Sequence, residues 1–129
     1  MISDLFFICL GGGFGSLMRY LVIILGEKAM NHFYDSSHPI GTFVVNLVGS
    51  FAIGILYGLF RNNLNVSNSL YLFLTIGFLG GFTTFSSFSL DAYKLIQSGE
   101  LIFGLIYIVL SVLLSLIFTF LGIFISNYF

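Results

Sequence analysis

Four long apolar stretches, separated by short polar segments, occupy nearly all of this 129-residue chain. They cover roughly residues 5–25, 40–60, 70–97 and 101–126. An α-helix needs about 20 apolar residues to cross the hydrocarbon layer of a membrane, where its backbone groups must bond internally. The sequence therefore predicts an all-α integral membrane protein, one four-helix unit over residues 1–129 in a lipid bilayer.

Charged residues are scarce, and this narrows the possible partners. Only 7% of residues are charged and the formal net charge is −1. Without a basic patch to neutralise phosphates, no nucleic acid partner is expected. The single Cys9 excludes a disulfide within one chain. Residues 1–4 carry an acid rather than the basic start of a signal peptide, so the first stretch is predicted to be retained as a span.

The third stretch is interrupted by a polar segment at residues 80–89, Gly-Gly-Phe-Thr-Thr-Phe-Ser-Ser-Phe-Ser. Hydroxyls and glycines at bilayer depth are tolerated where they face protein, water or an ion. We therefore predict a helix broken near residues 80–84 and the functional centre in this segment. Carbonyls freed at a break suit a hard cation such as Na⁺, whereas freed N–H groups and hydroxyls suit an anion. Phenyl edges favour an anion and phenyl faces a cation, so both alternatives stay open.

Polar residues recur every four positions in the other stretches, which places each set on one helix face. Asn46 lies in such a stripe, and its amide must bond either across helices or to a solute. Ser111 and Ser115 belong to a ladder of hydroxyls, interpreted as interhelical hydrogen bonding or as a track for a desolvated ion. Arg19 near the end of the first stretch is interpreted as reaching the membrane interface or facing an aqueous vestibule.

Glycines at the same spacing predict close helix packing. Gly11 and Gly15 repeat in the first stretch, and Gly54 and Gly58 repeat in the second. Small residues at this spacing let two helix backbones approach each other. These faces are therefore predicted to be helix contacts.

The distribution of Lys and Arg gives almost no preference for one orientation. Lys28 and Lys94 fall on one side of the predicted spans and Arg61 on the other. Positive loops normally stay in the cytoplasm, but a difference of one residue does not decide between the two sides. The chain is predicted to insert both ways, so that two opposed copies pair about an axis in the membrane plane.

Three sequence motifs closely resemble the Fluc (CrcB) fluoride channels. They are Gly-Thr-Phe-Val-Val-Asn at residues 41–46, the segment at residues 80–89, and Gly-Gly-Gly-Phe-Gly-Ser ahead of Arg19. The resemblance covers essentially the whole chain. It implies an antiparallel dual-topology homodimer, in which an inverted second copy completes two narrow fluoride pathways around a central structural Na⁺. It also implies passive export of toxic fluoride across the cytoplasmic membrane, with no enzymatic activity.

The same resemblance assigns roles to individual residues. It makes Phe85 and Phe88 the pore phenylalanines whose ring edges meet fluoride, and Asn46 the amide donor near the pore. It places the main-chain carbonyls of Gly80 and Thr83 from both copies around Na⁺. The hydroxyls that it assigns to the pathway are those of Thr84, Ser86, Ser87, Ser111 and Ser115.

Two other classes of protein share the four-span architecture. A small dual-topology proton-coupled multidrug exporter needs a membrane-embedded carboxylate in its first span, which this chain lacks. A non-transporting structural subunit explains the glycine stripes but not a broken helix rich in hydroxyls. His32 and His38 share a polar loop with Asp35, which makes a weak metal site, and we interpret them as surface residues.

Overall fold

The computed structural model describes residues 2–30, 39–62 and 67–128, and these residues form helices joined by short connections. The helices are α1 (Ile2–Met30), α2 (Ile40–Asn62), α3 (Asn68–Leu72), the π-helix η1 (Phe73–Leu79), α4 (Gly80–Phe82), α5 (Phe85–Gln97) and α6 (Leu101–Ser126). In this described part, four segments are long and apolar enough to cross a membrane: α1, α2, the run from α3 to α5, and α6. The loop that holds His32, Asp35 and His38 lies outside the described residues.

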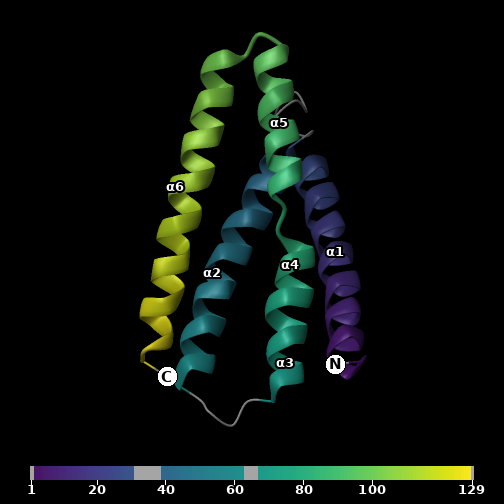
Figure 1. Ribbon diagram of the computed structural model, residues 1–129. Helices are drawn as coiled ribbons and strands as arrows, with labels where there is room; N and C mark the ends of the chain where they lie inside the picture. Colours follow the sequence, from purple (N-terminus) through teal and green to yellow (C-terminus); the bar gives the residue numbers. More distant parts are fainter. Residues whose placement is uncertain (1, 31–38, 63–66, 129) are drawn as a thin grey trace.

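The four segments lie side by side and alternate in direction, with both chain termini at the same end (Figure 1). Lys28 and Lys94 lie in the last turns of α1 and α5, and Arg61 lies in the last turn of α2. Because α2 runs opposite to α1 and α5, the two lysines lie at one end of the bundle and the arginine at the other. The near balance of positive charge predicted from the sequence is therefore kept in three dimensions.

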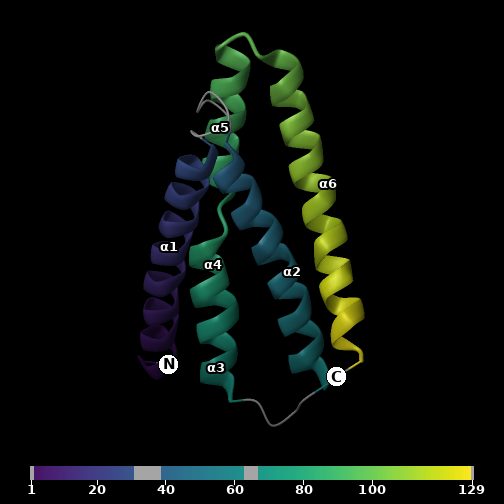
Figure 2. The ribbon, with the colours of Figure 1, turned by 180° about the vertical axis from the view of Figure 1, so that it is seen from behind.

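The glycine faces are the closest helix contacts, as their spacing predicted. α1 packs against η1 and α4, while α2 packs along α6 (Figure 2). A Cβ atom added to Gly11 or Gly15 would lie 2.8 Å from a backbone nitrogen of the neighbouring segment. A Cβ atom on Gly54 would lie 3.1 Å from the Cα atom of Gly122, and one on Gly58 would overlap the side chain of Ser126. Any larger residue at these positions would force the backbones apart.

The buried core is small and lies where α2 faces η1 and α4. Val45 is fully buried and packs with Leu79 and Phe82. Most other large apolar side chains are exposed in the single chain, including the greater part of those on α6. Such surfaces are expected on a protein whose outer faces meet lipid or a second chain.

Three spans are longer than the apolar stretches from which they were predicted. α1 begins at Ile2 rather than near residue 5 and continues to Met30, and the third run begins at Asn68. Polar residues support these extra turns, because Asp4 lies at the positive N-terminal end of α1 and Lys28 at its negative C-terminal end. Hydropathy marks the lipid-facing part of a helix, whereas hydrogen bonding and end charges determine where the helix stops. The bounds of α6 match the prediction.

Candidate functional site

Two residues between α4 and α5 leave the helical conformation. Thr83 has φ −79° and ψ 159°, and Thr84 has φ −153° and ψ 120°, so both are extended. The sequence predicted a break near residues 80–84; Gly80 and Gly81 lie in α4, and the extended residues of that range are Thr83 and Thr84. A Cβ atom on Gly81 would lie 2.5 Å from the carbonyl oxygen of Gly12 on α1. Gly81 is therefore required for close packing rather than for a turn.

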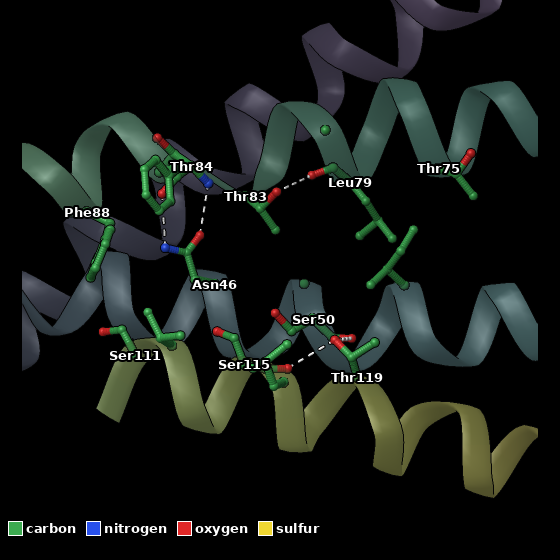
Figure 3. A pocket seen from close by; sticks show the side chains of 16 residues that line it. Asn46, Ser50, Thr75, Leu79, Thr83, Thr84, Phe88, Ser111, Ser115 and Thr119 are labelled. Atoms are coloured by element: carbon green, nitrogen blue, oxygen red, sulfur yellow. Dashed lines mark hydrogen bonds between the residues drawn. The ribbon is translucent and has the colours of Figure 1, made fainter. Parts of the chain in front are cut away.

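The side chain of Asn46 bonds to the backbone at this interruption. Its Oδ1 accepts a hydrogen bond of 2.8 Å from the Thr84 amide, and its Nδ2 donates one of 3.0 Å to the Thr84 carbonyl (Figure 3). Of the two alternatives for this amide, the structure contains the bond across helices. Asn46 thus supplies the partners that a continuous helix would have given to Thr84.

The end of α4 leaves carbonyl groups without helical partners. The Thr83 amide and the Thr83 Oγ1 both donate to the carbonyl of Leu79, each at 2.9 Å. Since the Thr84 amide bonds to Asn46, no backbone amide among the described residues donates to the carbonyl oxygen of Gly80. Carbonyls at a helix C-terminus carry a partial negative charge. This end of α4 is therefore suited to a cation.

The start of α5 gathers three hydroxyls. Thr84 caps the helix, because its Oγ1 accepts from the Ser87 amide at 3.1 Å. The same Oγ1 donates to Ser87 Oγ at 3.1 Å and lies 3.2 Å from Ser86 Oγ. The amides of a first helical turn carry a partial positive charge. The interruption therefore places a negative helix end and a positive helix end next to each other.

A cavity of about 520 Å³ opens beside the interruption, between α2, α6 and the run from α3 to α5 (Figure 3). The predicted site residues that line it are Asn46, Gly80, Thr83, Thr84, Phe85, Phe88, Ser111 and Ser115. Ser86 and Ser87 adjoin it through Thr84 but are not among its lining residues, and neither is Arg19, which is half-buried on α1. The fold thus brings most of the predicted residues into one place.

The two phenylalanines of α5 differ greatly in burial. Phe88 is 7% exposed, whereas Phe85 is 77% exposed in the single chain. Their ring centroids are 5.3 Å apart, and the ring of Phe88 also lies 5.4 Å from that of Tyr107. Phe85 therefore lines the cavity while most of its surface is left for contacts from outside the chain.

The hydroxyl ladder on α6 divides into two parts. Thr119 Oγ1 donates to the carbonyls of Ser50 and Ser115 at 3.1 Å and 3.0 Å, so this part makes the interhelical bond. Ser111 is 5% exposed, and its Oγ has no hydrogen-bond partner within the described part of the chain. The Tyr107 hydroxyl is likewise buried and unpaired there. A buried donor without a partner costs about 1–3 kcal/mol, so these hydroxyls require a partner that one chain does not supply.

Two polar residues near the site were not recognised from the sequence. Thr75 lines the cavity and donates from Oγ1 to the Tyr71 carbonyl at 2.7 Å. Asp91 on α5 accepts a 2.8 Å hydrogen bond from the buried Thr42 of α2. Thr42 begins the stripe that contains Asn46, so its spacing from Asn46 was the available signal. No group of three or more His, Cys, Asp or Glu suited to a metal ion occurs among the described residues.

Comparisons with known proteins agree in pointing to one family. A sequence profile described as "CrcB-like protein, Camphor Resistance (CrcB)" matches residues 6–123. The chain is 39% identical over 126 residues to "Fluoride-specific ion channel FluC" of Flavobacterium psychrophilum, with 98% of each chain covered. It is 48% identical over 111 residues to the protein of that name in Rhizobium etli (strain CIAT 652), with 86% of each covered. The corresponding Azobacteroides pseudotrichonymphae protein is 37% identical over 129 residues, with 100% of each covered. These relatives are named as ion channels, which are not enzymes.

Proposed function

Since the chain belongs to the CrcB-like family, we propose that this multi-pass protein of the cell membrane is a fluoride-selective channel that passively releases toxic fluoride from the cell. The observation that carries this proposal is the cavity beside the interruption. Neutral polar groups and the phenyl rings of Phe85 and Phe88 line it, and none of its described lining residues is charged. Fluoride is small, strongly hydrated and a strong hydrogen-bond acceptor, so several close donors must replace its water.

Residues that line or adjoin the cavity offer such donors. Ser111 offers a hydroxyl that has no other partner in the described part of the chain, and Ser115 lies one turn further along α6. The rings of Phe85 and Phe88 line the cavity, where their positive edges would favour an anion, and both belong to the first turns of α5, the positive end of that helix. Asn46 Nδ2 carries a second N–H besides the one that it donates to the Thr84 carbonyl, and this second N–H can serve an anion. Thr84, Ser86 and Ser87 extend the path with hydroxyls at the start of α5.

None of the described residues that line the cavity is a carboxylate that could couple export to protons. A coupled exporter needs a carboxylate that faces its substrate and can change protonation. Asp91 is the carboxylate on α5, but it bonds to Thr42 and is not among the lining residues. A passive channel driven by the gradient of the ion itself is therefore the better assignment.

The pathway requires a second copy of the chain. In one copy Phe85 is 77% exposed and the cavity is open on one side. A copy inserted in the opposite orientation would cover this face and bring its own Phe85 and Phe88, which gives two pathways per antiparallel homodimer. The balance between Lys28 and Lys94 at one end and Arg61 at the other is consistent with insertion both ways.

A Na⁺ ion between the two copies completes the proposed assembly. No backbone amide of the described residues donates to the Gly80 carbonyl. The nearest atom to a Cβ added at Gly80 would be the Thr75 carbonyl oxygen at 3.9 Å, so the surface there is open. Hard cations prefer oxygen ligands, and the carbonyls of Gly80 and Thr83 fit that preference. Two carbonyl oxygens from one chain are too few to hold Na⁺, whereas an inverted copy would add its own two. Bound Na⁺ would neutralise the negative ends of the two α4 helices.

Ion release from liposomes tests the proposal. Purified protein is reconstituted into vesicles loaded with potassium fluoride or potassium chloride, and valinomycin carries the compensating charge. We expect fast fluoride release, much slower chloride release and the same fluoride rate with or without a pH gradient. A well-folded protein in Na⁺ that releases no fluoride would refute the channel assignment. Fluoride release that follows the pH gradient would refute the passive mechanism.

A further inference from the structure

Asn46 makes more hydrogen bonds to the protein than a donor to an anion would need. Both functional atoms of its side chain bond to the backbone of one residue, Thr84, at 2.8 Å and 3.0 Å. A donor placed only to meet an ion in the cavity would not need its oxygen held by a backbone amide. The pairing spans 38 positions in sequence and joins the first half of α2 to the interruption.

The bond to the Thr84 amide changes which carbonyls are free. In a continuous α-helix the amide of Thr84 would donate to the carbonyl four residues earlier, which is that of Gly80. Asn46 Oδ1 takes this amide instead, and among the described residues the Gly80 carbonyl receives no other backbone donor. The bond from Asn46 Nδ2 to the Thr84 carbonyl keeps the adjoining peptide extended. The Asn46 side chain thus leaves the Gly80 carbonyl available and keeps the backbone at Thr84 extended.

We propose that Asn46 is a positioning residue for the cation site. It acts through Thr84 to keep the carbonyls of Gly80 and Thr83 outside the helical hydrogen-bond pattern and open to Na⁺. This inference rests on the Na⁺ site of the proposed function, and it adds a role for a residue that the resemblance assigns to the anion alone. One side chain on α2 then links the anion pathway to the cation that holds the two copies together.

A purely structural role would have a different signature, and the chain offers a matched control. Thr42, one turn before Asn46 on α2, donates a 2.8 Å hydrogen bond to Asp91 on α5. This bond also joins α2 to α5, but it lies away from α4. Thr42→Val should therefore reduce stability without changing the affinity for Na⁺.

The test measures how Na⁺ stabilises the purified dimer against heat. The unfolding midpoint is recorded in detergent over a range of Na⁺ concentrations, with choline replacing Na⁺ at constant ionic strength. For Asn46→Leu, a near-isostere that cannot make either bond to Thr84, we expect the Na⁺ concentration giving half of the stabilisation to rise about ten-fold. Thr42→Val should lower the midpoint at every Na⁺ concentration and leave the half-effect concentration unchanged.

Asn46→Asp separates the two roles of the residue. Aspartate keeps an oxygen acceptor for the Thr84 amide but lacks the amide N–H groups that Asn46 can offer to an anion. We expect Na⁺ to stabilise Asn46→Asp at a concentration no higher than for the wild type, while fluoride release falls. If Asn46→Leu yields no folded dimer, Asn46→Ala takes its place in the same measurement.

The outcomes distinguish this inference from its premise. A wild-type protein that Na⁺ does not stabilise would overturn the Na⁺ site itself. Stabilisation of the wild type with an unchanged half-effect concentration in Asn46→Leu would overturn the positioning role alone. So would an Asn46→Asp variant whose half-effect concentration rises as far as that of Asn46→Leu.

Discussion

Replacement of Gly81 by alanine tests whether close packing of α1 on α4 supports the interruption. The added Cβ would lie 2.5 Å from the Gly12 carbonyl oxygen and 3.1 Å from the Gly12 Cα atom. Carbon atoms in contact normally lie about 3.5–4.0 Å apart, so α1 must move away by roughly 1 Å. The opposing atoms belong to a helix backbone and cannot rotate aside. Gly11 and Gly15 pack equally closely on the same face, so any such movement loosens the whole contact.

The expected cost follows from this overlap. Overpacking of a tight contact costs about 1–3 kcal/mol, and the better helix propensity of alanine returns about 1 kcal/mol. Gly13→Ala on α1 is the matched control, because an added Cβ there meets no atom within 4 Å. Gly13→Ala should be neutral or up to about 1 kcal/mol more stable than the wild type. Gly81→Ala should therefore be about 1–3 kcal/mol less stable than Gly13→Ala.

Two measurements check this prediction. Unfolding of the purified variants in detergent reports stability, and fluoride release from liposomes reports whether the cavity keeps its shape. Gly81→Ala should lose stability and release fluoride more slowly, because α4 carries Gly80 and leads directly into Thr83. Equal stability of Gly81→Ala and Gly13→Ala would refute the packing argument. Lower stability with an unchanged fluoride rate would show that the cavity does not depend on this contact.

Three further predictions concern the cavity. Phe85→Ile and Phe88→Ile should each lower fluoride release at least about ten-fold, roughly 1.4 kcal/mol of lost ion stabilisation; wild-type release from both variants would mean that the rings only pack. Within one chain Phe85 is exposed and Phe88 is buried. Thermal unfolding of single chains in detergent should therefore show a free energy of unfolding lower by about 1–3 kcal/mol for Phe88→Ile, and no such loss for Phe85→Ile. Ser111→Ala should slow fluoride release without lowering the melting temperature, because the lost hydroxyl has no partner in the described chain. Thr119→Val should instead lower the free energy of unfolding by about 1 kcal/mol, because it removes the hydrogen bond to the Ser50 carbonyl. A destabilised Ser111→Ala variant would contradict the unpaired state of that hydroxyl.

Much of the architecture was predictable because its signals are local. Apolar runs long enough to cross a bilayer identified the four spanning segments, and α6 has the predicted bounds. Glycines every four residues identified the packed faces, since helix periodicity alone places them together. The polar segment at residues 80–89 contains most of the residues of the third span that line the cavity, with Thr75 and Leu79 as the exceptions.

The sequence placed the break near residues 80–84, but it could not determine which of these residues leave the helix. Glycine has the weaker helix propensity, yet Gly80 and Gly81 are helical while Thr83 and Thr84 are extended. Helix propensity makes only a small contribution to the free energy of each residue. Here it was outweighed by the two hydrogen bonds between Asn46 and Thr84 and by the close approach of α1 to Gly81.

The sequence by itself determined that this chain is a four-span membrane protein with polar groups at bilayer depth, because apolar length and helical period are properties of neighbouring residues. Only the tertiary structure decided which polar groups are already paired and which remain free for an ion. Thr119 reaches the Ser50 carbonyl, whereas Ser111, two turns away on the same face, has no partner in the described chain. The two hydroxyls share one helical stripe, and only the positions of the opposing helices distinguish them.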